Sequence, residues 1–169
     1  VWVEGKFSWI DDGSWNITTD FETDALVSNI TATREDFGIR LKFVDFVDSE
    51  HTAFCRRIEI ENLTDREIEP RLFLHQVFQI SNEGRADTVL YVPSGNYLFD
   101  YKGRCSLLIH ARDANNQPFD QFSVGNYGIE GKEGTFKDAE DGELSGNLVE
   151  HGGVDSVVRC CIPLEPRGN

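Results

Sequence analysis

Apolar and polar residues alternate along most of the chain before residue 130, and this period of two constrains the fold more than any other feature. In one segment Ile39, Leu41 and Phe43 alternate with Arg40 and Lys42. Successive side chains of a strand point to opposite faces, so a segment of this kind forms a half-buried strand. Clusters of Gly, Asn, Asp and Ser separate the segments and predict turns. The sequence therefore predicts a protein built of strands.

The segment 67–80 departs from simple alternation, because from Arg71 onward it is apolar on both faces. This pattern is typical of a central strand that is covered on both sides. We expect Leu26 to share one face with the apolar residues that follow it, and Phe54 to face inward. Only the segment 136–143 suggests a helix, and it is short and contains a glycine. We predict an all-β, two-layer antiparallel sandwich with strands at 1–10 (two short strands around a turn), 15–21, 25–33, 37–47, 52–61, 67–80, 87–92, 96–101, 106–111, 121–124 and 154–162.

The stretch Gly131–Ser156 differs from the rest, because it is too rich in Gly and acidic residues for a core strand or a regular helix. Structureless loops longer than roughly 12–15 residues are uncommon in compact domains and are often functional. The acidic run 138–143 does not fit the EF-hand calcium template, since its glycine is at the fifth position and Val149 occupies the twelfth. We therefore place the candidate site in this stretch and predict no metal or cofactor.

The charge of −14 and the pI near 4.6 argue against nucleic acid or an anionic membrane as a partner. The sequence has no apolar run near 18 residues and no signal peptide. Four cysteines without ligand spacing fit reduced thiols in the cytoplasm, with a Cys55–Cys105 disulfide as the weaker alternative. The start at Val1, without Met, indicates a fragment of a longer protein.

The other residues that suggest metal binding, catalysis or sugar binding have ordinary structural explanations. His75 lies in the apolar strand, and we expect a hydrogen-bonded core residue rather than a metal ligand. Carboxylate pairs suited to glycoside hydrolysis arise by chance among 30 acidic residues. Trp2, Trp9 and Trp15 are candidates for a sugar-stacking platform, although core or interface packing explains their clustering equally well.

Several stretches together resemble one family in the same order along nearly the whole chain. They are VWVEGKFSWIDDGSW, RRIEIENLTDREIEPRLFLHQVFQIS, YKGR, FDQFSVGNYG, GKEGTFKDAEDGELSGN and GGVDS. This chain resembles the N-terminal β-sandwich of prokaryotic glycoside hydrolases of family 15, the glucoamylase, glucodextranase and trehalase-like enzymes. The most specific part runs from Asp138 to Asn147. The sequence departs from the family at Leu148 and at 150–153, where members often carry a Pro and a Gln-Gly-Ser run.

The resemblance implies a supersandwich of the galactose-mutarotase type that lacks several strands at its N-terminal edge. It implies one domain over 1–169 that packs on a catalytic (α/α)6 barrel of the same parent chain, which holds both catalytic carboxylates. No catalytic residue is therefore expected here. The residues expected at the substrate or the domain interface are Lys132, Asp138, Glu140, Asp141, Glu143 and Asn147.

Two further functions stay open beside this non-catalytic role in carbohydrate metabolism. One is an autonomous carbohydrate-binding module for α-glucan that uses the tryptophans with Tyr97 and Tyr101. The other is a free-standing mutarotase-like enzyme. Missing strands would also expose sheet edges, which favours a homodimer.

Overall fold

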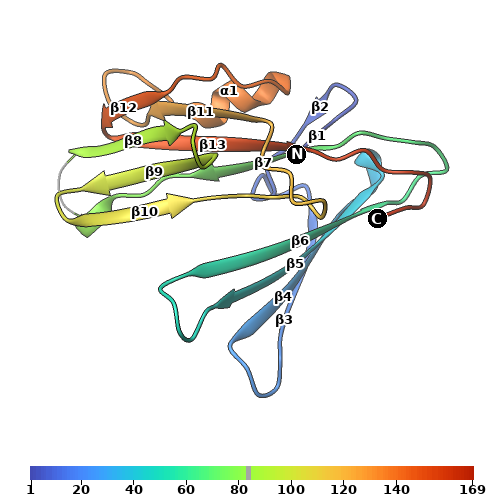
Figure 1. Ribbon diagram of the computed structural model, residues 1–169. Coiled ribbons are helices and arrows are strands. Elements are labelled where there is room, and N and C mark those ends of the chain that lie inside the picture. The colour runs from blue at the N-terminus through green and yellow to red at the C-terminus, as the bar shows by residue number, and fades with distance from the viewer. Residues whose placement is uncertain (83–84) are drawn as a thin grey trace. The chain divides into compact units, whose positions relative to one another are not determined.

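The computed structural model describes residues 1–82 and 85–169, and nearly all of its regular elements are strands (Figure 1). Every strand pairing is antiparallel, and the strands form three sheets. The predicted all-β antiparallel class is confirmed. The strands are β1 (Trp2–Val3), β2 (Lys6–Phe7), β3 (Asn16–Phe21), β4 (Val27–Arg34), β5 (Ile39–Val47), β6 (Phe54–Asn62), β7 (Arg71–Gln76), β8 (Asp87–Val92), β9 (Tyr97–Lys102), β10 (Cys105–Ile109), β11 (Gln121–Asn126), β12 (Val149–Gly152) and β13 (Val154–Cys161).

The chain divides into two compact units. The large unit comprises residues 1–7 and 71–162, and the small unit comprises residues 8–70 and 163–169. The single domain expected over 1–169 depends on how the units associate, and it stays a prediction.

The large unit is a two-layer β-sandwich. One sheet has the order β11-β13-β7-β1-β2, and the other has the order β10-β9-β8-β12. Its core lies between the sheets, where inward positions of β13 and β8 meet. As predicted, β7 is central in its sheet, paired on one side with β13 and on the other with β1. The buried core residues are Val89, Leu98, Phe119, Val124, Val154 and Val158.

A third layer covers the outer face of the first sheet of the large unit. It consists of the single-turn helix α1 (Thr135–Asp138), the 3-10 turn η3 (Ala139–Asp141) and the segment that follows them (Figure 1). α1 packs on β11 and β13, and the outward Val157 of β13 is fully buried beneath this layer. The cover explains why β13 is buried along both of its faces.

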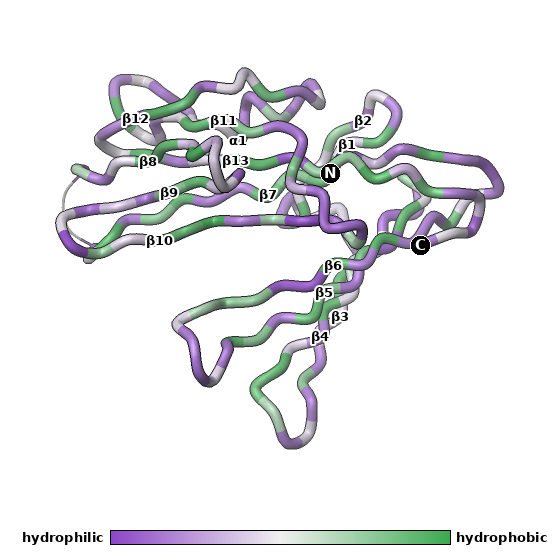
Figure 2. The backbone as a smooth tube through the Cα atoms, in the orientation of Figure 1, coloured by the Kyte–Doolittle hydropathy of each residue, from purple (hydrophilic) through white to green (hydrophobic). Residues whose placement is uncertain are grey.

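The small unit is the four-stranded sheet β3-β4-β5-β6 with the 3-10 turn η1 (Glu35–Phe37) between β4 and β5. The alternation of its strands is visible in Figure 2. On the apolar face, Ala32, Leu41 and Ile60 are aligned across three strands and buried. The side chain of Asn62 donates to the carbonyls of Arg66 and Glu165 at 2.7 and 2.9 Å, which fixes the C-terminal segment to the end of β6.

Several details of the predicted strands are wrong. Leu26 is 97 % exposed because it lies in the turn before β4, and Phe54 is 64 % exposed because it begins β6 at the turn end of the β5–β6 hairpin. β7 runs from Arg71 to Gln76 rather than from residue 67 to residue 80. β12 was not expected, because its four residues include a glycine and carry no alternation long enough to detect. All four cysteines are free thiols, so the Cys55–Cys105 disulfide is not formed.

Two aspartates are buried on the inward face of the second sheet of the large unit. Asp87 and Asp100 are each 2 % exposed, and one carboxylate oxygen of each has no hydrogen-bond partner among the described residues. Burial, and then the negative charge of Asp87, raises the pKa of Asp100 to about 6. A raised pKa in the folded state means that Asp100 favours folding at low pH and that this contribution is lost as the pH rises through 6.

The substitution Asp100→Asn should therefore stabilise the protein above pH 7, because it removes a charge that folding buries. We expect a gain of about 2 kcal/mol at pH 8 and little change at pH 4, measured by urea unfolding at both values. Asp24→Asn, at an exposed turn, is the control and should change neither value. A gain of the same size at pH 4 and pH 8 would contradict the assignment.

Candidate functional site

Within the stretch 131–156, residues 131–147 lead into and form the cover of the large unit, whereas the residues after them belong to β12 and β13. Two glycines set the path of the cover. Gly134 precedes α1 with φ +112°, and a Cβ there would lie 2.6 Å from a carboxylate oxygen of Asp155. Gly142 ends η3 with φ +91°, and a Cβ there would lie 2.9 Å from Arg71 Nη1 and from Trp2 Nε1. Both positions combine a left-handed backbone with a close approach, so only glycine fits them without strain.

Asp155 of β13 fixes the start of the cover. Its carboxylate is 1 % exposed and accepts hydrogen bonds from the Thr135 backbone amide at 2.6 Å and from Thr135 Oγ1 at 2.8 Å. His75 Nε2 of β7 also hydrogen-bonds this carboxylate at 2.8 Å. The predicted hydrogen bond of His75 is confirmed, but the residue is half-buried on the outward face of β7 and does not belong to the core. Within the described ranges, no group of three or more His, Cys, Asp or Glu side chains could hold a metal ion.

Arg159 of β13 fixes the end of the cover. The residue is 7 % exposed, and its Nη1 donates to the Gly142 carbonyl at 2.9 Å and to Glu143 Oε2 at 2.8 Å. Its Nε donates to Asp120 Oδ2 at 3.0 Å. Arg71 of β7 donates to the same Gly142 carbonyl at 2.9 Å and to Glu143 Oε1 at 2.6 Å. Two arginines on neighbouring strands thus hold one turn of the cover.

The charges of this cluster shift the pKa values of its members. A hydrogen bond from Gln121, together with Arg159 and Arg71, lowers the pKa of Glu143. Burial alone would lower the pKa of Arg159, but Asp120 and Glu143 outweigh it and raise that pKa. Glu143 is therefore an anion over the whole physiological range. It acts as a structural counter-ion.

Asp138, Asp141 and Asn147 also brace the cover. Asp138 Oδ2 accepts hydrogen bonds from the Ser145 amide and hydroxyl, both at 2.8 Å. Asp141 Oδ1 accepts from the Glu143 amide at 2.9 Å. Asn147 donates to the Val124 carbonyl of β11 at 2.7 Å. These contacts bring the residues together as parts of one folded segment.

Glu140 and Lys132 lie at the surface of the large unit, where Asp141, Glu143 and Asn147 are exposed as well. Glu140 pairs with Lys137 one helical turn away at 2.9 Å, and both side chains are about half exposed. Lys132 contributes its backbone carbonyl to a turn, where it accepts from the Gly128 amide at 2.9 Å, and the residue is exposed. A role of the six residues at a substrate or a domain interface stays a prediction.

Sequence reasoning missed the arginine and aspartate partners of the cover. Arg159 and Asp155 lie four residues apart on the outward face of β13, a strand made mostly of apolar residues. A charged residue in an apolar strand needs a partner when it is buried. Such charges within β13 were the signal that could have pointed to a covering layer.

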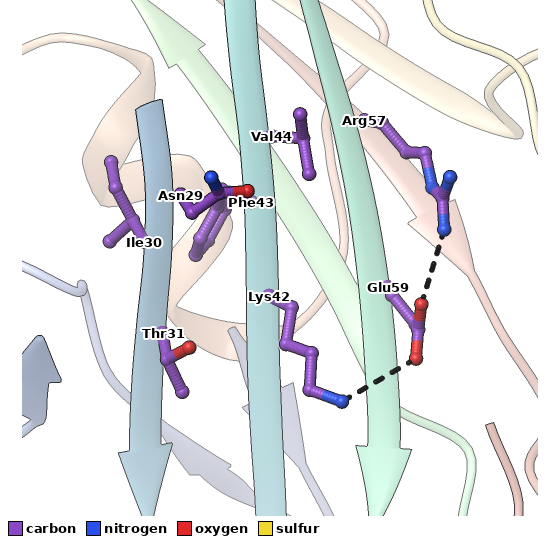
Figure 3. A pocket seen from close by; sticks show the side chains of 8 residues that line it. All are labelled: Asn29, Ile30, Thr31, Lys42, Phe43, Val44, Arg57 and Glu59. Atoms are coloured by element: carbon purple, nitrogen blue, oxygen red, sulfur yellow. Dashed lines mark hydrogen bonds and ion pairs between the residues drawn. The ribbon is translucent and has the colours of Figure 1, made fainter. Parts of the chain in front are cut away.

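The small unit carries a shallow hollow of about 250 Å³ on the polar face of β4, β5 and β6 (Figure 3). Lys42 Nζ lies 3.8 Å from Glu59, and Arg57 Nη2 lies 3.4 Å from the same carboxylate. The first pair joins β5 and β6, and the second lies along β6; such ion pairs are common on the solvated face of an antiparallel sheet.

Two of the three tryptophans, Trp15 and Trp2, have packing partners. Trp15 is 7 % exposed, donates to Ser8 Oγ at 2.9 Å and packs edge-on against Phe37 in the small unit. In the large unit the guanidinium of Arg71 lies over the Trp2 ring, 4.2 Å from its centre. The stacking platform is therefore wrong for Trp15, and the packing alternative holds.

Comparison with known proteins shows which class of protein the chain resembles. No family model matches the chain. The chain is 29 % identical over 164 residues to an uncharacterized glycosyl hydrolase of Methanocaldococcus jannaschii. The match covers 96 % of this chain and 25 % of that protein. Its fold is similar to part of a bacterial glucoamylase whose crystal structure contains acarbose, with a TM-score of 0.69, 11 % identity, and coverage of 93 % of this chain and 24 % of that one.

These findings define a glycoside hydrolase-related β-sandwich. The resemblance predicted from the sequence is confirmed, for the sequence by the hydrolase relative and for the fold by the glucoamylase. The chain spans about a quarter of the length of each of these proteins. Among the described residues, no helix is long and apolar enough to cross a membrane.

Removing Arg159 should detach the cover, because Asp120 and the turn at Gly142 lose a buried partner. We expect Arg159→Leu to lower the free energy of unfolding by about 3 kcal/mol, measured by urea unfolding at pH 7. The control is Lys137→Ala, which removes the surface ion pair with Glu140 and an exposed contact with the Phe136 ring and should cost less than about 1 kcal/mol. Equal losses in the two variants would show that the cluster does not hold the cover.

Proposed function

We propose that this chain is a non-catalytic β-sandwich domain of a longer protein that hydrolyses α-glucosides, and that it packs on and supports the catalytic barrel of that protein. One observation carries the proposal: nearly the whole chain matches only a quarter of a glycosyl hydrolase and a quarter of a glucoamylase. Most of each of those proteins therefore lies outside the matched region.

The chemistry of the described carboxylates supports a non-catalytic role. Glycoside hydrolysis requires a carboxylic acid with a raised pKa beside an open substrate site. The pKa of Glu143 is lowered, and Asp138 is committed to hydrogen bonds within the cover. Asp100 has a raised pKa of about 6, but it is buried within the sandwich where no sugar can reach it. The acids described above thus fail one requirement or the other.

A hydrolysis assay tests the proposal directly. The purified 169-residue chain should release no glucose from maltotriose or trehalose, whereas the full-length protein encoded by the same gene should hydrolyse an α-glucoside. Turnover by the isolated chain, abolished by substitution of one of its own carboxylates, would overturn the proposal.

The solvent-facing residues of the cover are the ones available to a second domain. In the full-length protein, the double variant Lys132→Ala/Glu140→Ala should lower the melting temperature or the activity, because an interface loses its polar contacts. The same double variant in the isolated chain should leave the melting temperature within about 1 °C, since both side chains are exposed. An unchanged full-length protein would show that this part of the cover does not meet another domain.

A further inference from the structure

A hollow of about 240 Å³ opens at one end of the large unit, where strands of both sheets begin or end. β7 ends at Gln76 and β11 ends at Asn126, whereas β8 and β13 begin at this same end of the unit. The hollow is lined chiefly by the residues that follow or precede these strands, among them Phe78, Gln79, Arg85, Asp87, Tyr127 and Gly153. Loops at the end of a rigid sandwich are common positions for binding sites.

Two aromatic rings form the apolar part of the hollow. Phe78 is 40 % exposed and Tyr127 is 44 % exposed, and Val77 beside them is 46 % exposed. Single exposed apolar residues need no explanation, but a group around one hollow indicates a surface that contacts something else. Aromatic rings supply flat apolar area at low entropic cost, and this area suits a ligand ring that has an apolar face of C–H groups.

Polar groups lie beside these rings. Arg85 donates from Nη1 to the Gly128 carbonyl at 2.8 Å, which holds its guanidinium at the rim. Asp87 also borders the hollow, but it is only 2 % exposed, so its carboxylate lies beneath the surface, with Lys102 Nζ 3.8 Å from Oδ1. Of the residues that line the hollow, Arg85 is therefore the charged one that a ligand can reach.

The wall of the hollow is held in place before any ligand arrives. The Tyr127 amide donates to the Gly153 carbonyl at 2.8 Å, and a Cβ at Gly153 would lie 3.0 Å from the Tyr127 carbonyl. The Tyr127 ring also packs edge-on against Phe136 of α1. Such preorganisation lowers the entropic cost of binding.

We propose that this hollow binds one pyranose ring of a neutral sugar, with its apolar face on Phe78 and Tyr127 and its hydroxyls toward Arg85. Its volume lies below the roughly 300–1,000 Å³ of sites for drug-sized ligands, so a single ring fits better than an oligosaccharide. A neutral ligand is favoured because the chain carries a net charge of −14, which repels anions. The choice of glucose as the sugar rests on the proposed function.

The test is a titration of the 169-residue chain with methyl α-D-glucopyranoside, followed by NMR through the amides of Gly128 and Gly153. We expect saturable shifts of these amides. The variant Phe78→Ala should weaken binding about threefold to tenfold, the effect of losing one ring contact. Glucuronate, which carries a carboxylate, should bind more weakly than the neutral glucoside.

Tyr101→Ala is the matched control, because Tyr101 is 38 % exposed, stacks on Phe99 and is not among the residues that line the hollow. This variant should bind as the parent chain does. Absence of saturable binding, or binding lost in Tyr101→Ala but kept in Phe78→Ala, would overturn the inference. The titration involves no hydrolysis, so its outcome is separate from that of the activity assay.

Discussion

Two opposite charges on the outward face of β13 determine how the large unit is completed. Asp155 and Arg159 are both nearly inaccessible to solvent, and burial of an isolated charge costs several kcal/mol. The segment 135–147 supplies many of their partners: the amide and hydroxyl of Thr135 for the acid, and the carbonyl of Gly142 with the carboxylate of Glu143 for the base. The buried charges of β13 therefore require the cover, and these charges in turn hold the cover in place.

This dependence explains the composition of the cover. A segment that must place backbone groups against buried side chains needs glycine where the chains approach most closely, as at Gly134 and Gly142. It needs short polar side chains that satisfy its own backbone, as Asp138 and Asp141 do. A composition that resembles an acidic functional loop is thus also what a tightly fixed third layer requires.

The sequence predicted most strands because period-two alternation is a local property, and it placed β7 centrally because apolar residues on both faces imply two neighbouring layers. It did not predict β12, whose pairing with β8 depends on residues far away in the chain. The exposed ends of the hairpins, such as Leu26, were misjudged because alternation alone does not show where a sheet extends past its core.

Part of the stretch 131–156 forms a layer of its own, as its unusual composition suggested, but the internal order of this layer could not be inferred. The acidic residues were visible in the sequence, whereas Arg71 lies 72 positions from its partner Glu143. Contacts over such separations arise from strand order, and no local pattern encodes them. For the same reason the hollow beside Phe78 and Tyr127 emerges only once β7 and β11 are neighbours of β13.

Native-state hydrogen exchange measures most directly whether the cover is an integral layer. The amides of Thr135 and Leu144 donate to Asp155 and to the Gln121 side chain, and they should exchange with the same free energy and denaturant dependence as the amides of β13. That result would show that the cover opens only when the sandwich unfolds. Exchange of these two amides through a smaller, denaturant-independent opening, while β13 stays protected, would contradict the account.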